Sequence, residues 1–228
     1  MARVCIFDVN ETLLDLGALD SHFARIFGDA SLRKAWFTQM LQSALVATIT
    51  DAYSPFGTIG VTSLEMLANR QGVTLTDGDR QALRDGMEHL PPHPEVRVSL
   101  ARLQSAGLRL SALTNSTRSV AEAQLSNAGL SEFFEQILSA DEVRRLKPAP
   151  EPYRMAAQRL GVEISEIRLI AAHAWDIAGA LRVGCAAAFV ARPGMVLDPL
   201  VKKPDVVGRD LLEVAEQILA LENAQPSN

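Results

Sequence analysis

The sequence predicts an α/β fold, a doubly wound, Rossmann-like parallel sheet with a helical cap inserted after its first strand. Short apolar runs alternate with segments of helical period, a pattern typical of strand–helix–strand units in a parallel sheet. The apolar runs lack the polar–apolar alternation of half-exposed strands, so both of their faces should be buried. A long stretch of mostly helical pattern, residues 15–91, separates the first run from the second and exceeds an ordinary connection.

Six apolar runs are the candidate strands of this sheet. They are residues 4–7, 108–113, 136–139, 168–172 and 186–190, with a short edge strand at 205–207. Segments of helical period lie between them and end at glycines, which act as stop signals; these segments are residues 119–128, 151–160 and 177–183. Ligands of such sheets bind at the carboxyl ends of the strands, so side chains at those ends are candidates for a functional site.

The stretch between the first two strands has a helical pattern of its own. Its candidate helices are residues 31–47, 61–70 and 76–90. Thr76 and Asp79 are spaced as a capping box at the start of the last one. The sequence therefore predicts an α/β core domain formed by residues 1–14 and 92–228, and a helical cap domain of residues 15–91 that lies above the strand ends as a lid.

Composition indicates a soluble globular protein. The 228 residues carry a formal net charge of -5, which argues against a nucleic-acid or membrane surface. A small anionic substrate is still compatible with this charge, because one local Lys or Arg outweighs distant charges. Cys5 and Cys185 lie in apolar runs and are expected to be buried, reduced thiols. With no leader-like segment at Met1 and no uninterrupted apolar span, we expect a cytoplasmic protein, either a monomer or a homodimer.

Polar side chains follow the predicted strands at four places. They are Asp8 and Thr12 after the first strand, Thr114 and Asn115 in "SALTNST", Lys147 and Tyr153 in "RRLKPAPEPY", and His173, Trp175 and Asp176 in "IAAHAWDIAG". Each group alone is more often structural than catalytic. Because the carboxyl ends of parallel strands meet at one edge of a sheet, we expect the four groups to converge on one site.

In this order the residues resemble the signature of the haloacid dehalogenase superfamily, which is an Asp nucleophile, a Ser or Thr, a Lys and a final acidic loop. The resemblance spans nearly the whole chain, including the cap. The sequence is most similar to the type II (L-2-)haloacid dehalogenases, through "TNS" at 114–116, Lys147-Pro148 with Tyr153, and "AWD" at 174–176. The resemblance implies hydrolysis of short 2-haloalkanoic acids, such as haloacetates or L-2-halopropionates, to 2-hydroxy acids and a halide ion.

Two acids of the superfamily's phosphatases are absent from this chain. Asn10 stands where phosphatases carry the acid that protonates a leaving alkoxide, and Ala172 stands where a metal-binding acid is expected. A halide leaves without a proton, so we expect dehalogenation without a metal or other cofactor. A Mg²⁺-dependent phosphatase or phosphonatase of the same fold is the main alternative. A non-catalytic binding protein is a second one, against which the retained set of Asp8, Lys147 and Asp176 argues.

The mechanism that the resemblance implies is nucleophilic. Asp8 attacks the substrate C2, expels the halide and forms an ester, and water activated near Asp176 then hydrolyses that ester. Lys147 keeps Asp8 ionised. Hydroxyl and amide groups that hold the nucleophile and the substrate carboxylate are expected from Thr12, Thr114 and Asn115.

The resemblance also implies a substrate pocket formed partly by the cap. Arg33 is the candidate for holding the halide, with a solvated helix arginine as the alternative. Trp175 and Phe56 are expected to form an apolar wall, although packing alone also explains Phe56. Tyr153 is either a positioning hydroxyl or a core tyrosine. Asn10 replaces a bulkier residue of the pocket, which leaves the preferred halide and chain length open.

The segment before "AWD" and the turn after the first strand also depart from the family pattern. Many type II dehalogenases show Ser, Ser and Asn before "AWD", where this chain has Ala171, Ala172 and His173. His173 either orients or deprotonates the hydrolytic water, or is a structural histidine that contacts the cap. Glu11 stands in the first turn, where the family commonly has glycine, and is expected to be an exposed acid.

Overall fold

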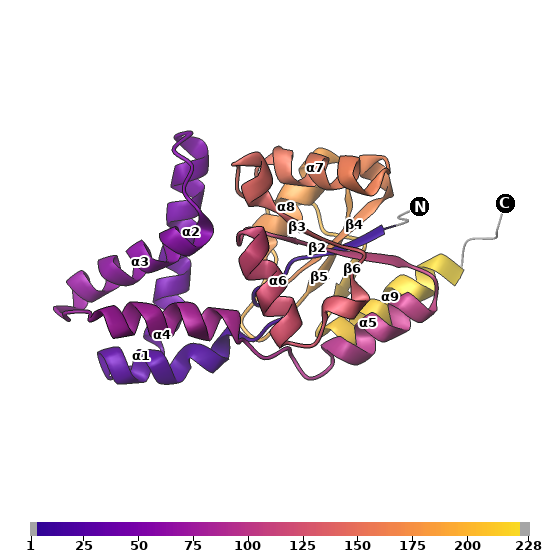
Figure 1. Cartoon of the computed structure of the whole chain (residues 1–228). Coiled ribbons are helices and arrows are strands. Elements are labelled where there is room, and N and C mark those ends of the chain that lie inside the picture. Colours follow the sequence, from indigo (N-terminus) through magenta and orange to yellow (C-terminus); the bar gives the residue numbers. More distant parts are fainter. Residues whose placement is uncertain (1–3, 224–228) are drawn as a thin grey trace.

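The computed structural model describes residues 4–223 and contains a six-stranded parallel sheet covered by helices (Figure 1). The strands lie in the order β3 (Gln136–Ser139), β2 (Arg109–Thr114), β1 (Val4–Phe7), β4 (Ile167–Ala171), β5 (Ala186–Val190) and β6 (Val206–Gly208). Each strand pairs with its neighbour in parallel. The chain reverses its direction of winding at β1, so the carboxyl end of β1 is a topological switch point. The predicted α/β class is confirmed.

The strands are buried on both faces, as the lack of alternation predicts. In β1, Val4 and Ile6 pack in one apolar cluster, whereas Cys5 and Phe7 pack in the other. The first cluster lies under α7 (Pro150–Leu160) and α8 (Ala174–Val183), and the second lies under α5 (Val96–Ser105), α6 (Arg118–Asn127) and α9 (Leu211–Asn223). Both cysteines are buried free thiols, and burial raises the pKa of each to about 12.

The helices between β1 and α5 form a separate group beside the sheet, at the left of Figure 1. They are α1 (Asp20–Phe27), α2 (Leu32–Ile49), α3 (Phe56–Gln71) and α4 (Asp77–Glu88). Trp36 of α2 is buried and donates its indole N–H to the carbonyl of Gly60 in α3 at 2.8 Å. The predicted capping box of Thr76 and Asp79 is present at the start of α4. This group follows β1 directly, which places it next to the side chains at the end of that strand.

Several element boundaries differ from the prediction. The strands expected at 108–113, 168–172 and 205–207 are each shifted by one residue. Helix α3 begins at Phe56, because Pro55 sets its start and the poor helix formers that follow obscure its first turns in the sequence. Helix α8 begins at Ala174, which places Asp176 in its first turn. Helices α1, α5 and α9 were not predicted. Within residues 4–223, no helix is both long enough and apolar enough to cross a membrane.

Candidate active site

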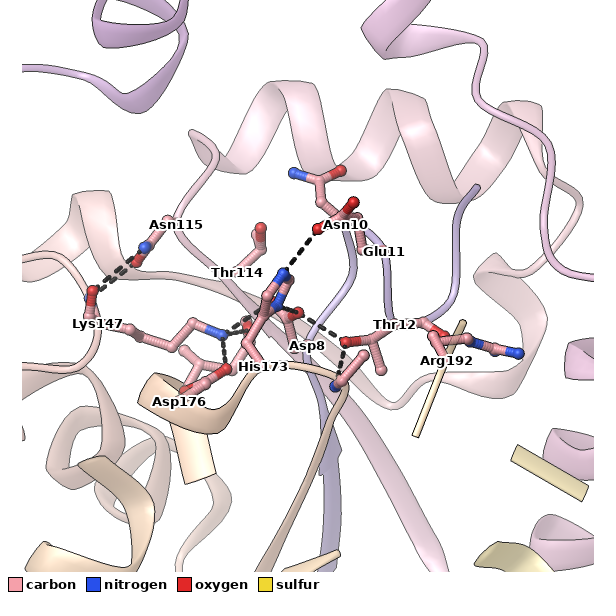
Figure 2. Close-up of polar contacts among 12 residues, drawn as sticks. Asp8, Asn10, Glu11, Thr12, Thr114, Asn115, Lys147, His173, Asp176 and Arg192 are labelled. Atoms are coloured by element: carbon pink, nitrogen blue, oxygen red, sulfur yellow. Dashed lines mark hydrogen bonds and ion pairs between the residues drawn. The ribbon is translucent and has the colours of Figure 1, made fainter. Parts of the chain in front are cut away.

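The carboxylate of Asp8 lies at the carboxyl end of β1 and is held from two sides (Figure 2). The hydroxyl of Thr12 donates to Asp8 Oδ2 at 2.7 Å, and the same hydroxyl accepts the N–H of Ala172 at 3.0 Å. Because the N–H of Ala172 occupies a lone pair of the Thr12 oxygen, the hydroxyl proton of Thr12 points at Asp8. The ammonium of Lys147 donates to Asp8 Oδ1 at 3.0 Å. Asp8 is 5 % exposed, so Thr12 and Lys147 donate to a carboxylate that is almost completely shielded from water.

Lys147 is buried and uses its three ammonium protons within the site. Its Nζ lies 3.0 Å from Asp8 Oδ1, 2.6 Å from Asp176 Oδ2 and 2.8 Å from the carbonyl of Leu113. Asn115 fixes the backbone of Lys147, because its Oδ1 accepts the Lys147 N–H at 2.8 Å and its Nδ2 donates to the Lys147 carbonyl at 3.3 Å. The end of β2 therefore positions the lysine that bridges the two acids.

The charges of Asp8 and Lys147 stabilise each other. Burial alone raises the pKa of Asp8, but the Lys147 charge and the hydrogen bonds from His173 and Thr12 outweigh it and hold this pKa well below its usual range. Burial lowers the pKa of Lys147, but the charges of Asp176 and Asp8 outweigh that effect and raise it. Asp8 is therefore ionised, and Lys147 is protonated, at neutral pH.

Asp176 accepts hydrogen bonds on both carboxylate oxygens. Lys147 occupies Oδ2, and the hydroxyl of Tyr153 donates to Oδ1 at 2.5 Å. Burial and the nearby Asp8 charge raise the pKa of Asp176, although Lys147 and Tyr153 oppose the shift. Asp176 and Tyr153 are both completely buried. The hydroxyl of Tyr153 therefore positions Asp176 instead of facing substrate, and each oxygen of Asp176 already accepts a hydrogen bond.

His173 lies between two carboxylates. Its Nδ1 is 3.3 Å from Asp8 Oδ2, and its Nε2 is 2.9 Å from Glu11 Oε2. The rings of Trp175 and Phe37 lie with their centroids 5.1 and 5.9 Å from the imidazole. Burial lowers the pKa of His173, but the hydrogen bonds to Asp8 and Glu11 and their charges raise it to about 9. Glu11, expected to be an exposed acid, is instead a partner of His173, and its side chain is only 16 % exposed.

A cavity of about 580 Å³ lies between the cap helices and the core beside His173. Its walls include Glu11, Arg33, Phe37, Leu41, His173 and Trp175. Arg33, the candidate halide ligand, reaches the cavity but is already paired, since its Nε lies 2.5 Å from Asp20 Oδ1 and its Nη1 lies 3.7 Å from Glu11 Oε1. Aromatic side chains and charged groups of both signs line this cavity, which makes it the candidate ligand site.

Three residues expected to touch substrate have other partners in the structure. The amide of Asn10 accepts from Gln124 at 3.1 Å and donates to Ser116 at 3.4 Å, because a buried amide must be hydrogen-bonded. The hydroxyl of Thr114 accepts the N–H of Ser116 at 3.1 Å. Phe56 lines a separate apolar cleft of about 260 Å³ between the cap helices and the start of α6, because it starts a helix that packs on α2. Asn10 and Thr114 thus shape the loops around Asp8, and Phe56 shapes the cap.

The oxygen ligands at this site do not fit Mg²⁺, which needs several oxygen ligands in an octahedral arrangement. The ammonium of Lys147 lies between the carboxylates of Asp8 and Asp176 and binds both. Asn10, where a further acid would stand, is engaged by Gln124. In the described part of the chain, no group of three or more His, Cys, Asp or Glu side chains is arranged to hold a metal. The lysine supplies the positive charge that a metal would bring.

Sequence reasoning missed three contributors to the site. Glu11 was assigned to solvent, and Phe37, on the cap helix α2, was not singled out. Arg192 follows β5 and donates to the carbonyl of Thr12 at 2.7 Å and to Glu95 at 2.5 Å, which holds the turn after Asp8. The rule that found the other residues, a polar side chain at the carboxyl end of a strand, would also have found Arg192.

Known proteins resemble this chain along most of its length. Residues 2–184 match the family model of the haloacid dehalogenase-like hydrolases. The chain is 28% identical over 207 residues to (S)-2-haloacid dehalogenase 2 of Pseudomonas sp. (strain CBS-3), covering 90% of each protein. It is 27% identical to haloacetate dehalogenase H-2 of Moraxella sp. (strain B), covering 87% of this chain and 90% of that protein.

A solved structure is also similar to this chain along nearly its whole length. A dehalogenase crystallised as an intermediate complex superimposes with a TM-score of 0.86 at 25% identity, covering 96% of both chains. The chain therefore belongs to the haloacid dehalogenase-like hydrolase family.

Proposed function

We propose that this hydrolase cleaves the carbon–halogen bond of short 2-haloalkanoic acids, such as haloacetates or L-2-halopropionates, through an ester formed on Asp8. The observation that carries the proposal is a buried carboxylate kept ionised by Lys147, next to a cavity suited to a small anion. Two relatives bear the names (S)-2-haloacid dehalogenase and haloacetate dehalogenase, which supports this substrate class. In this proposal, residues 15–91 act as a cap domain over a core domain.

In the first step, an Asp8 oxygen forms a bond to C2 of the substrate while the carbon–halogen bond breaks, and the halide leaves with the electron pair. Thr12 and Lys147 hold the carboxylate in one orientation, so little motion is needed at the moment of attack. Trp175 faces the cavity, and its indole N–H lacks a hydrogen-bond partner among the described residues. That N–H is buried in this structure, so it would reach the departing halide or the substrate carboxylate only after the indole ring turns toward the cavity.

In the second step, water attacks the carbonyl carbon of the Asp8 ester and releases the 2-hydroxy acid. The side chain placed to accept the proton of this water is His173, whose Nδ1 lies 3.3 Å from Asp8 Oδ2. Asp176, the alternative base, is buried, and its two oxygens already accept hydrogen bonds from Lys147 and Tyr153. Lys147 stabilises the negative charge that develops on the Asp8 oxygens during this attack.

The purified enzyme is expected to release chloride or bromide from a panel of short 2-haloacids in the presence of EDTA. Chelation should leave the rate unchanged, because Lys147 pairs with both acids and Asn10 is engaged by Gln124, which leaves too few oxygen ligands for Mg²⁺. The measurement is halide release with and without EDTA, alongside phosphate release from a generic phosphate ester. Phosphate release that requires added Mg²⁺, with no halide release from the panel, would replace this proposal by a phosphatase.

A further inference from the structure

Glu11 occupies a backbone conformation that its residue type rarely adopts. Its φ of 61° lies in the left-handed region, which is uncommon for residues other than glycine. Its N–H donates to the carbonyl of Leu14 at 2.9 Å, and its own carbonyl contacts His93 Nε2 at 3.2 Å. These contacts hold the turn, and the turn directs the carboxylate of Glu11 to His173 (Figure 2). The side chain is thus placed by a constrained backbone.

Both nitrogens of His173 face an acid, so the imidazole joins Glu11 to the nucleophile. Phe37 and Trp175 fix the plane of the ring, which leaves Nδ1 toward Asp8 and Nε2 toward Glu11. Other charged groups lie farther from the ring, behind the two acids or across the cavity; they are Asp15, Arg33, Lys34, His93, Lys147, Asp176 and Arg192. The carboxylates of Asp8 and Glu11 have the largest electrostatic effect on the imidazole. They raise the pKa of His173 to about 9, although burial lowers it.

We propose that Glu11 is a positioning residue that holds His173 as a cation while Asp8 is ionised and as a neutral base, with Nδ1 facing the ester, once Asp8 has been esterified. This inference rests on the ester intermediate of the proposed function. Esterification removes the negative charge of Asp8, and with it one of the two groups that favour the imidazolium. The chemistry of the first step therefore prepares the base for the second.

The proton balance of this cycle closes. In the free enzyme, His173 carries protons on both nitrogens and donates to Asp8 and Glu11. When Asp8 becomes an ester, the Nδ1 proton passes to solvent through the cavity, while the Nε2 proton stays on the ring and is donated in a hydrogen bond to Glu11. Nδ1 then takes a proton from water as the water oxygen bonds to the ester carbonyl carbon. As the tetrahedral intermediate collapses, this proton moves to the departing alkoxide. The carboxyl proton left on Asp8 returns to His173, so one turnover releases one proton and one halide.

The charge coupling can be measured without substrate, by NMR titration of the imidazole resonances. The chain has four histidines, and a His173→Asn variant assigns the resonance of interest. Asp8→Asn mimics the uncharged ester and is expected to lower the pKa of His173 from about 9 by at least about one unit. Glu11→Gln is expected to lower it as well, whereas Glu122→Gln, in an exposed pair with Arg118, should leave it unchanged. An unaltered pKa in Asp8→Asn would overturn the proposed switch.

The positioning role is measured by rapid-quench kinetics on Glu11→Gln, with Glu122→Gln as the matched control. A positioned base contributes ~10²–10⁴-fold to the rate, and loss of its positioning should remove part of this. We therefore expect ester hydrolysis to slow by about 10- to 100-fold, so that the ester accumulates on the Asp8 peptide. Hydrolysis needs neutral His173, so its rate rises with pH, and the lower pKa in Glu11→Gln should move this rise to lower pH.

The two proposals fail in different ways. Equal slowing of ester formation and hydrolysis in Glu11→Gln, or no shift of the pH profile, would overturn the role of Glu11. Absence of halide release and of ester in the unaltered enzyme would overturn the proposed function instead. In that case the NMR titration would still decide whether Asp8 and Glu11 control the charge of His173.

Discussion

The Asp8→Asn variant is expected to release no halide above about 10⁻⁴ of the original rate, since removal of a nucleophile that acts as part of a unit costs several orders of magnitude. An amide is a poor nucleophile of nearly the same shape. The fold should persist, because Lys147 keeps its 2.6 Å contact with Asp176 and its bond to the Leu113 carbonyl. The measurements are halide release and far-UV circular dichroism on the same preparation.

Mass spectrometry of the peptide that carries residue 8 is the necessary control for this variant. Slow deamidation of the new asparagine restores the nucleophile and would return activity in proportion to the deamidated fraction. Halide release that substantially exceeds this fraction would show that Asp8 is not the nucleophile. A loss of folded signal would be equally informative, because it would assign Asp8 a structural role beside Lys147.

Lys147→Met is expected to lower both stability and turnover. Removal of one partner from a buried ion pair typically costs about 3–5 kcal/mol, and here it leaves Asp8 and Asp176 as uncompensated neighbours. One of the two acids must then take up a proton, so the nucleophile is no longer reliably ionised. Turnover should fall by about 10²–10³-fold or more, the effect of losing one group that stabilises the developing negative charge. Urea denaturation and halide release measure the two effects.

A double variant tests whether charge causes the loss of stability. Adding Asp176→Asn to Lys147→Met removes the second buried charge and should recover part of the lost stability, because unpaired buried charge is the source of the cost. Lys203→Met, at an exposed position, is the matched control and should change stability by less than about 0.5 kcal/mol. If Lys147→Met were as stable as the control, the ion pairs of Lys147 would not stabilise the fold.

The sequence predicts the part of the site that follows from strand order. Asp8, Lys147 and Asp176 lie in segments that a parallel sheet brings to one edge, so their convergence required only the strand pattern and the short distances of these residues from the strand ends. Thr12 was found for the same reason, as it stands in the turn after Asp8. The α/β class and the inserted cap follow from the apolar periods and from the length of the first connection.

Side-chain pairing was harder to predict than position. His173 and Glu11 are separated by 162 residues, and which polar group faces which depends on rotamers and on an unusual backbone angle at Glu11. Arg33 was expected to hold the halide, but Asp20 in the neighbouring helix pairs with it. Tyr153 was expected at the pocket, yet the buried oxygen of Asp176 requires a donor there. Such competition among local partners leaves no periodic signal in a sequence.

The origin of the oxygen in the product tests the proposed ester on Asp8 most directly. A single turnover is run in H₂¹⁸O with enzyme in excess over a 2-haloacid, and the product and the Asp8 peptide are analysed by mass spectrometry. If the ester forms, the 2-hydroxy acid carries ordinary oxygen from Asp8, and the heavy isotope appears in the carboxylate of Asp8. Heavy oxygen in the product and none in Asp8 would show that water attacks the substrate directly, and would contradict the nucleophilic role of Asp8.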